Sequence, residues 1–151
     1  MAVWFLDMRV INKKARFNYE LGERTEAGIE LTGAEVKSTK LGQVQMDGAY
    51  VKLRPNRFGN VEAWVTGLQI FPYKHADNTG YDPMRSRRLL LHQKEIVSLM
   101  SKMKQSGRLL VPTTIYTLGS RLKIELALAR GKKKYEKREK IKKRDLEREQ
   151  S

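Results

Sequence analysis

The chain has 151 residues, and its 31 Lys and Arg against 17 Asp and Glu give a formal net charge of +14. With 40% hydrophobic residues it has enough apolar side chains for one packed domain. No apolar run approaches the ~20 residues that a membrane-spanning helix needs. The absence of cysteine excludes disulfide scaffolds, thiolate metal sites and cysteine catalysis. Because charges interrupt the apolar N-terminus, we expect no secretion signal and a soluble, cytoplasmic protein.

The first predicted elements lie within residues 19–41. Residues 19–31 form two extended segments in this prediction, separated at Gly22 and the charged turn that follows it. Thr32 is a typical helix N-cap, and Glu35 three residues later completes a capping box. We therefore expect a helix that begins after Thr32 and ends at Gly42.

The middle of the chain alternates strands with turns. Residues 49–54 predict a strand, residues 55–60 a turn, and residues 61–70 the hairpin partner of that strand. Residues 71–88 predict a long irregular stretch, because prolines and a glycine interrupt it.

A second helix and two further strands complete the predicted fold. Residues 92–104 carry apolar side chains at helical spacing, and Gly107 ends that helix. Residues 109–116 and 121–129 predict strands, the second with clear alternation of apolar and polar side chains. About six antiparallel strands with two or three helices predict an α+β fold, mainly β, built on a small OB-like barrel. The aromatic residues expected to fill the core are Tyr50, Trp64 and Tyr116.

Positive charge is densest at the C-terminus, where residues 130–151 contain 11 Lys and Arg against 5 Asp and Glu, a net charge of +6. Gly131 marks the boundary between the body of the protein and this basic segment. We divide the chain into an N-terminal extension (1–11), the barrel (12–130) and a basic tail (131–151). The tail has few apolar side chains but good helix formers, so we expect it to be disordered when free and helical when bound to a polyanion. The alternative is a solvated tail that improves solubility.

No pattern in the sequence indicates catalysis or metal binding. His75 and His92 are the two histidines, and neither belongs to a cluster with metal-ligand spacing. Glu26 and Glu30 would share a strand face but lie too far apart for joint acid–base chemistry. Phosphate-binding glycine loops and serine-nucleophile motifs are absent. We therefore expect no enzyme activity, no catalytic residue, no metal and no cofactor.

Basic clusters near aromatic residues indicate a nucleic-acid partner, because Lys and Arg neutralise phosphates and aromatic rings stack on unpaired bases. Composition does not separate RNA from DNA, but the lack of a DNA-reading helix-turn-helix or zinc finger favours RNA. The basic clusters are Lys13-Lys14-Arg16, Arg85-Arg87-Arg88, Lys102-Lys104 and Lys132-Lys133-Lys134. The aromatic residues in or near them are Phe17, Tyr19, Phe71, Tyr73, Tyr81 and Tyr135.

An ordered set of motifs resembles one protein family. The motifs are residues 12–16 (NKKAR), 26–29 (EAGI), 33–38 (GAEVKS), 50–51 (YV), 62–64 (EAW), 82–91 (DPMRSRRLLL), 123–127 (KIELA) and 131–138 (GKKKYEKR). In this order the chain is similar to the SmpB family, small basic bacterial proteins that act with transfer-messenger RNA (tmRNA) in rescuing stalled ribosomes. There are two departures: Glu136 stands where the family usually has Asp, and Phe17 where it often has His.

The resemblance implies an RNA-binding protein of trans-translation, in the bacterial cytoplasm and associated with the ribosome. Family members bind the tRNA-like domain of tmRNA, which lacks an ordinary anticodon arm, and the protein takes the place of that arm. Their basic tail enters the empty mRNA channel of the small ribosomal subunit and becomes helical there. The implied partners are tmRNA and the ribosome, with no membrane, and the RNA-bound protein is expected to be a monomer.

The resemblance and the basic clusters together give the expected site residues. Lys123 would reach a phosphate, and Glu26 would accept a hydrogen bond from a base or ribose or else orient a nearby arginine. Two roles are open for Leu90: it forms an apolar platform for a splayed base, or it packs in the core beside Leu89 and Leu91. The residues expected to bind tmRNA are Asn12, Lys13, Lys14, Arg16, Glu26, Leu90 and Lys123. The tail residues expected at the decoding centre, where Tyr135 would stack on a base, are Gly131, Lys132, Lys133, Lys134, Tyr135, Lys137 and Arg138.

The sequence leaves two rival classes open. A structural ribosomal protein is also small, basic and tailed, and it would co-purify with all ribosomes. An RNA-processing enzyme needs a catalytic acid, base or metal cluster, which this sequence does not show.

Overall fold

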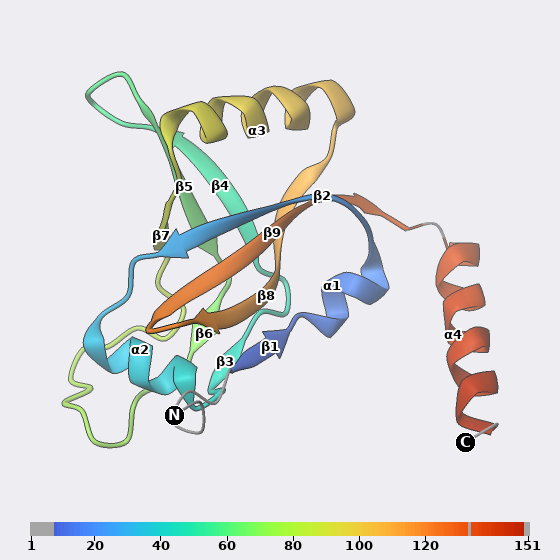
Figure 1. Ribbon diagram of the computed structural model, residues 1–151, viewed down its shortest axis with the longest axis horizontal. Helices are drawn as coiled ribbons and strands as arrows, with labels where there is room; N and C mark the ends of the chain where they lie inside the picture. Colours follow the sequence, from blue (N-terminus) through green and yellow to red (C-terminus); the bar gives the residue numbers. More distant parts are fainter. Residues whose placement is uncertain (1–7, 133, 150–151) are drawn as a thin grey trace.

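The computed structural model describes residues 8–132 and 134–149 of the chain. These residues form a strongly curved antiparallel sheet, a separate pair of short strands and four helices (Figure 1). The side chains of residues 134–137, 140 and 149 lie outside the described part.

Seven strands pair in one sheet, in the spatial order β1-β8-β9-β2-β7-β5-β4. Every neighbouring pair in this order is antiparallel. A second sheet consists of β3 and β6. The strands are β1 (Arg9–Ile11), β2 (Tyr19–Ile29), β3 (Val44–Gln45), β4 (Tyr50–Pro55), β5 (Val61–Thr66), β6 (Gln69–Ile70), β7 (Arg87–Leu90), β8 (Leu109–Leu118) and β9 (Arg121–Gly131).

The four helices of the described residues are α1 (Lys13–Asn18), α2 (Gly33–Lys40), α3 (Gln93–Ser106) and α4 (Lys134–Glu149). Helix α3 lies across one end of the sheet, whereas α4 stands apart from it beyond the end of β9 (Figure 1). No helix in the described ranges is long and apolar enough to cross a membrane.

The main hydrophobic core lies between the inner face of the sheet and α3. Leu89 of β7 and Ile124 of β9 are buried on this inner face, and Ile96 and Leu99 of α3 join the same cluster. Because side chains alternate along a strand, the residues between these core positions point to the opposite side of the sheet, which we call the outer face.

The local signals at the helix ends are confirmed. The Thr32 hydroxyl accepts a hydrogen bond from the Glu35 N–H at 3.2 Å, and the Glu35 carboxylate accepts one from the Thr32 N–H at 3.0 Å. This capping box begins α2. Helix α3 ends at Gly107, whose φ of 65° is the left-handed conformation that glycine adopts without a steric penalty.

The expected α+β class with a mainly antiparallel sheet is confirmed, but a closed barrel is not shown. Among the described residues the edge strands β1 and β4 are not paired with each other. The described residues contain nine strands rather than about six. Residues 9–11, which we placed in an N-terminal extension, form β1 and pair with β8.

Three strand assignments were wrong. Residues 61–70, expected to form one strand, form β5 as far as Thr66 and then β6, which pairs with β3 in the second sheet. Residues 19–29 form one strand, β2, whose register against β9 shifts between Leu21 and Arg24, so Gly22 marks a bulge rather than a turn between strands. Residues 87–90 form β7, a central strand that begins within the stretch expected to be irregular (71–88) and that the sequence did not predict. The sequence pattern does not reveal β7, because its first residue, Arg87, is charged although it occupies a buried position where an apolar residue is expected.

The expected placement of three aromatic residues in the core is also wrong. Tyr50 is 42% exposed, and Trp64 and Tyr116 are half-buried. Strand register explains this result: Trp64 adjoins the buried Ala63 and Val65 and therefore points to the outer face.

Candidate nucleic-acid interface

Five strands contribute one residue each to a continuous row across the outer face. Arg9 pairs with Tyr116, Tyr116 with Lys123, Lys123 with Gly28, and Gly28 with Leu90. Directly paired residues of antiparallel strands project from the same face of the sheet. We call these five residues the central row. It joins Lys123 and Leu90, two residues expected to bind RNA, although β7 and β9 are not neighbours.

Leu90 is an exposed residue and not a core residue. Its side chain is 54% exposed, whereas that of Leu89 is 2% exposed, because the two project from opposite faces of β7. The structure thus rejects the core-packing alternative for Leu90. A Cβ atom on Gly28 would lie 3.1 Å from Cβ of Leu90, so the leucine covers the space that the glycine leaves. An apolar surface therefore adjoins Lys123 on the outer face.

Glu26 lies on the same face, two residues before Gly28 on β2. Its Oε2 accepts a short hydrogen bond from the Tyr116 hydroxyl. Burial, the hydrogen bond and the negative charge of Glu26 together raise the pKa of Tyr116 to about 12. The Arg9 guanidinium lies 5.6 Å from the centroid of the Tyr116 ring. Because the carboxylate of Glu26 is exposed, its second oxygen is available to a hydrogen-bond donor in RNA.

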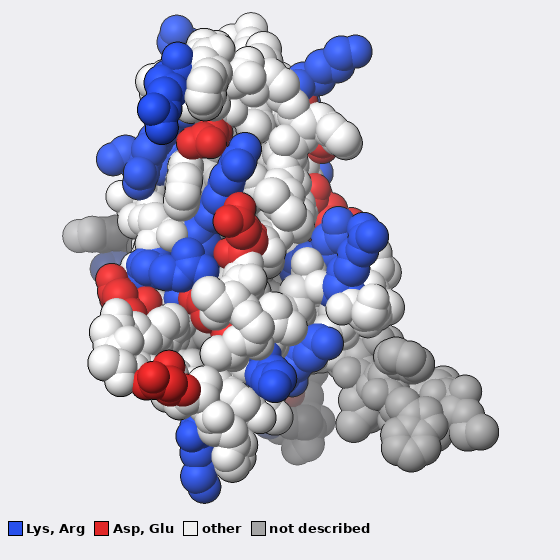
Figure 2. Space-filling view, turned by 90° about the vertical axis from the view of Figure 1, so that its left-hand side faces the viewer, with Lys and Arg blue, Asp and Glu red and all other residues white. Residues whose placement is uncertain are grey.

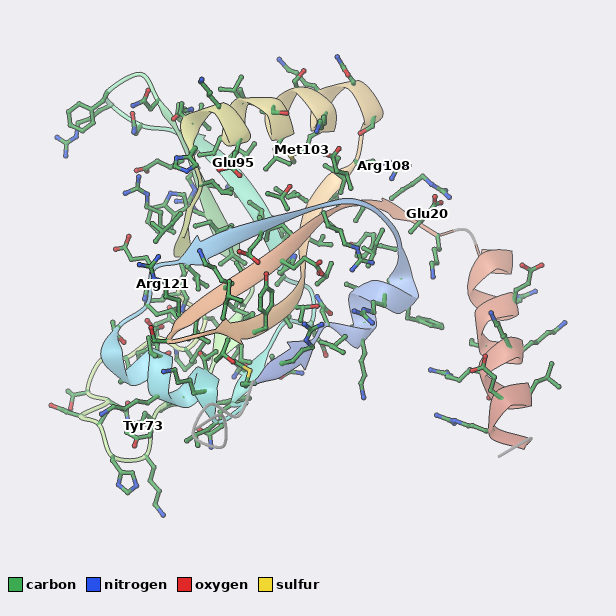
Figure 3. The ribbon with its side chains drawn as sticks, viewed as in Figure 1. Glu20, Tyr73, Glu95, Met103, Arg108 and Arg121 are labelled. Atoms are coloured by element: carbon green, nitrogen blue, oxygen red, sulfur yellow. The ribbon has the colours of Figure 1, made fainter. Side chains whose placement is uncertain are left out.

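Lys123 carries an uncompensated positive charge in this arrangement. It forms no ion pair with any residue in the described part of the chain. Arg121 precedes it by two residues on the same face, is exposed, and lies at the start of β9 (Figure 3). The two side chains give this end of the face a positive potential that suits phosphate groups.

The outer face continues over β5 and β4 with a second group of basic and aromatic side chains. Arg88 pairs with Trp64, and Trp64 pairs with Lys52. The Arg54 guanidinium lies 5.4 Å from the centroid of the Trp64 ring, a cation–π contact. Arg88 lies 3.6 Å from the Glu62 carboxylate, so its charge is partly neutralised. On the side of the molecule that faces left in Figure 1, Lys and Arg outnumber Asp and Glu (Figure 2).

The basic residues of α1 lie at the far end of this face and adjoin the tail. Ala15 packs against Val111 and Ala129, which holds α1 on the outer face of β8 and β9. Ala129 is six residues beyond Lys123 on β9, about 20 Å along the strand. Lys13 and Lys14 are exposed on this helix.

Asn12 has a structural role that the sequence did not indicate. It is buried, and its Oδ1 accepts a hydrogen bond from the Ala15 N–H at 3.1 Å, which caps α1. Its Nδ2 donates to the carbonyl oxygens of Pro112 at 2.8 Å and Met46 at 3.3 Å. These contacts leave its side chain little opportunity to bind RNA directly, but they fix the helix that presents its basic neighbours.

The first tail residues are bound to α1. The Lys132 N–H donates to the carbonyl oxygen of Asn18, and its Nζ donates to that of Arg16, both at 3.0 Å. Gly131 ends β9 and pairs with Tyr19. The structure therefore groups Arg16, Lys132 and Gly131 at the junction of body and tail, rather than with the central row.

The remaining tail residues are described in part. In α4, Arg138 is exposed, and the Arg144 guanidinium lies 6.0 Å from the centroid of the Phe17 ring on α1. Lys133 lies outside the described residues, as do the side chains of Lys134, Tyr135 and Lys137.

One expected basic cluster is mostly internal. Arg87 is fully buried and Arg85 is half-buried, and both form ion pairs with the buried carboxylate of Glu35. Burial by itself would raise the pKa of Glu35, but hydrogen bonds from Arg85, Thr32 and Arg87 lower it to about 2. Arg88 is therefore the only exposed residue of this cluster. The expectation that Arg87 contacts phosphate is wrong, because Arg87 holds the fold together.

Sequence reasoning missed three members of the central row. Arg9, Tyr116 and Gly28 were not among the residues expected at the site, because their place in the row follows from strand pairing. Gly28 belongs to the quoted motif 26–29, but that motif did not indicate a role for it. Within residues 8–132 and 134–149, no group of three or more His, Cys, Asp or Glu is arranged to hold a metal ion.

Comparison with known proteins gives a consistent result. The family described as "SmpB protein" matches residues 9–151. A protein from Oleidesulfovibrio alaskensis named "SsrA-binding protein" is 49% identical over 138 residues, which cover 91% of this chain and 86% of the relative. A protein of the same name from Persephonella marina is 47% identical over 140 residues, or 93% of this chain and 89% of the relative.

The fold also matches a solved structure. A chain in the structure described as "tmRNA-SmpB: a journey to the center of the bacterial ribosome" superimposes with a TM-score of 0.66 and 39% sequence identity. The match covers 83% of this chain and 85% of the other.

Proposed function

The chain belongs to the SmpB protein family, and from this premise we propose that it binds tmRNA and acts with it in trans-translation on stalled ribosomes. The relatives are named for binding SsrA, and the matching structure is described as tmRNA-SmpB in the bacterial ribosome. Its place of action would be the ribosome in the bacterial cytoplasm.

The single observation that carries the proposal is the central row. It places the unpaired cation of Lys123, the apolar surface of Leu90 and, two residues away on β2, the acceptor of Glu26 on one continuous face. RNA recognition uses these three chemistries, because phosphates need cations, unstacked bases need apolar or aromatic surfaces, and ribose hydroxyls need acceptors. In this proposal the outer face binds the tRNA-like domain, and the protein body replaces its missing anticodon arm.

The tail has a separate role in the proposal. It enters the empty mRNA channel of the small subunit, and residues 131–138 contact the decoding centre. The contacts of Lys132 with α1 support a fixed starting point for this tail, and the exposed Lys13 and Lys14 would contact rRNA or tmRNA beside it. An isolated helix of the length of α4 is marginally stable in water, so we propose that rRNA phosphates stabilise it and that it is disordered in the free protein.

Recovery of RNA from cells tests the proposal. The tagged full-length protein is purified from the bacterium at low salt, and the bound RNA is sequenced. We expect strong enrichment of tmRNA over all other RNAs, and loss of that enrichment in the double variant Lys123→Ala/Leu90→Ala.

If the chain were a structural ribosomal protein, it would instead co-purify with all rRNAs in stoichiometric amounts. The double variant would not change that recovery. Leu90 is exposed and Lys123 is half-buried on the outer face, and neither belongs to the hydrophobic core, so the variant is expected to fold as the wild type does.

A further inference from the structure

The loop between β4 and β5 presents an aromatic ring to solvent. Residues 56–60, which we call the hairpin loop, project from the sheet beside α3 (Figure 1). Phe58 in this loop is 79% exposed, the highest value among the large hydrophobic side chains of the described residues. The exposed ring offers a free aromatic face on which a ligand can pack.

The hairpin loop is ordered without any help from the phenylalanine ring. Oδ1 of Asn56 accepts hydrogen bonds from the N–H groups of Phe58 at 2.9 Å and Asn60 at 3.0 Å. The Asn56 N–H donates to the carbonyl oxygen of Asn60 at 2.8 Å, and Gly59 supplies the left-handed turn with a φ of 82°. These bonds fix the backbone that carries the ring, which lowers the backbone entropy lost when a ligand binds.

Cations accompany the exposed ring. The Arg57 guanidinium lies 5.7 Å from the centroid of the Phe58 ring. The same combination of an aromatic ring and cations recurs on strands β4 and β5. There Arg54 lies against Trp64, and Lys52 is the strand partner of Trp64. Aromatic rings interleaved with Arg and Lys suit an unpaired nucleotide, since the base stacks on the ring and the phosphate binds the cation.

A hollow joins the hairpin loop to the proposed RNA surface. A pocket of about 290 Å³ lies between the loop and β7, and its lining includes Asn56, Asn60, Arg88 and Leu90. Leu90 is thus both the end of the central row and part of the edge of this pocket. An RNA strand bound at the central row therefore has a continuous, partly polar path to the hairpin loop.

We propose that the hairpin loop is a second RNA contact, in which Phe58 stacks on an unpaired nucleotide of tmRNA and Arg57 binds its phosphate. This inference rests on the proposed function and adds to it a position outside the motifs that indicated the family. It commits to RNA rather than a protein partner, because the Arg57 guanidinium lies beside the exposed ring and polar as well as apolar side chains line the neighbouring pocket.

The test measures the affinity of the full-length protein for tmRNA at fixed salt. Stacking on an aromatic side chain is worth about 5- to 150-fold in affinity, so we expect Phe58→Ala to bind roughly tenfold more weakly. Phe58→Trp keeps an aromatic face and should bind at least as tightly as the wild type. Phe58→Leu keeps apolar area without an aromatic face and should resemble Phe58→Ala. The exposure of Phe58 makes all three variants compatible with folding.

Hydroxyl-radical footprinting of tmRNA locates the contact. We expect protection of a short unpaired segment that is lost with Phe58→Ala, while protection that depends on Lys123 remains. Equal affinities and footprints for the wild type and Phe58→Ala would overturn the inference but leave the proposed function intact. Loss of ribosome association with unchanged tmRNA affinity would assign the hairpin loop to a ribosomal partner and also overturn it. Failure of the wild type to bind tmRNA would overturn the proposed function itself.

Discussion

Arg87 and Glu35, 52 residues apart in the chain, form an ion pair inside the fold. Nε of Arg87 donates to Oε2 of Glu35 at 2.7 Å, and neither side chain is more than 1% exposed. The other guanidinium nitrogens donate to carbonyl oxygens, including those of Leu68 at 2.8 Å and Pro83 at 3.0 Å. The pair joins the first turn of α2 to β7 and positions the long loop before β7. The ion pair thereby fixes the position of β7, the strand that carries Leu90.

The first prediction concerns the stability that this pair provides. Glu35→Gln leaves the Arg87 guanidinium buried without an opposite charge, so the free energy of unfolding should fall by about 3 kcal/mol or more. Urea denaturation followed by circular dichroism measures the change. Glu30→Gln, at an exposed position next to β2, is the matched control and should change stability by less than about 0.5 kcal/mol. Equal effects of the two variants would show that the buried pair is not important for stability.

The second prediction is an acid dependence. The pKa of Glu35 is about 2 in the fold against an ordinary value of 4.5. A lowered folded-state pKa stabilises the protein above pH 4.5, and this contribution, about 3 kcal/mol, is lost as the pH falls from 4.5 towards 2. The difference in unfolding free energy between the wild type and Glu35→Gln should therefore shrink over that range. A difference that stays constant down to pH 2.5 would contradict a carboxylate held ionised by its arginine partners.

The third prediction concerns Lys123. Lys123→Ala should weaken tmRNA binding and reduce the slope of log affinity against log salt by about one unit, because one phosphate contact is lost. Lys40→Ala, at an exposed position in the last turn of α2, removes the same charge outside the basic clusters and the central row and should leave the slope unchanged. Filter-binding titrations at several salt concentrations give both slopes. An unchanged slope for Lys123→Ala would place this residue off the RNA surface.

The fourth prediction uses the contact between Gly28 and Leu90. Gly28→Ala places a methyl group 3.1 Å from Cβ of Leu90, so the leucine must move and tmRNA binding should weaken several-fold. Gly33→Ala is the control, since a Cβ there meets no atom within 4 Å. The effect should vanish in a Leu90→Gly background, where the Cβ atom at 3.1 Å and the rest of the side chain that must move are absent. Additive losses in that double-mutant cycle would show that Gly28 acts independently of Leu90.

The fifth prediction separates body and tail. A chain truncated after residue 133 keeps the contacts of Lys132 with α1, so it should bind tmRNA nearly as tightly as the full chain. It should fail to support tagging of nascent peptides in a reconstituted translation system with stalled ribosomes. Parallel loss of tmRNA binding and tagging would refute the division of labour between body and tail.

Local signals predicted the helix ends well because they are local interactions. The capping box of Thr32 and Glu35 and the left-handed Gly107 are each complete within a few residues, so they can be recognised in the sequence. β7 was missed for the opposite reason. Arg87 occupies a core position in that strand only because Glu35 neutralises it from a distant part of the chain.

The sequence by itself determined the excess of positive charge, the dense basic tail, the antiparallel α+β class and the resemblance to one family. These properties follow from composition, alternation and motif order, which do not depend on contacts between distant residues. The tertiary structure decided which charges face outward. Burial removed Arg87 from the outer face, and strand register placed Lys123, Gly28 and Leu90 in one row. Register is set by pairing between strands far apart in the chain, so no local pattern encodes it.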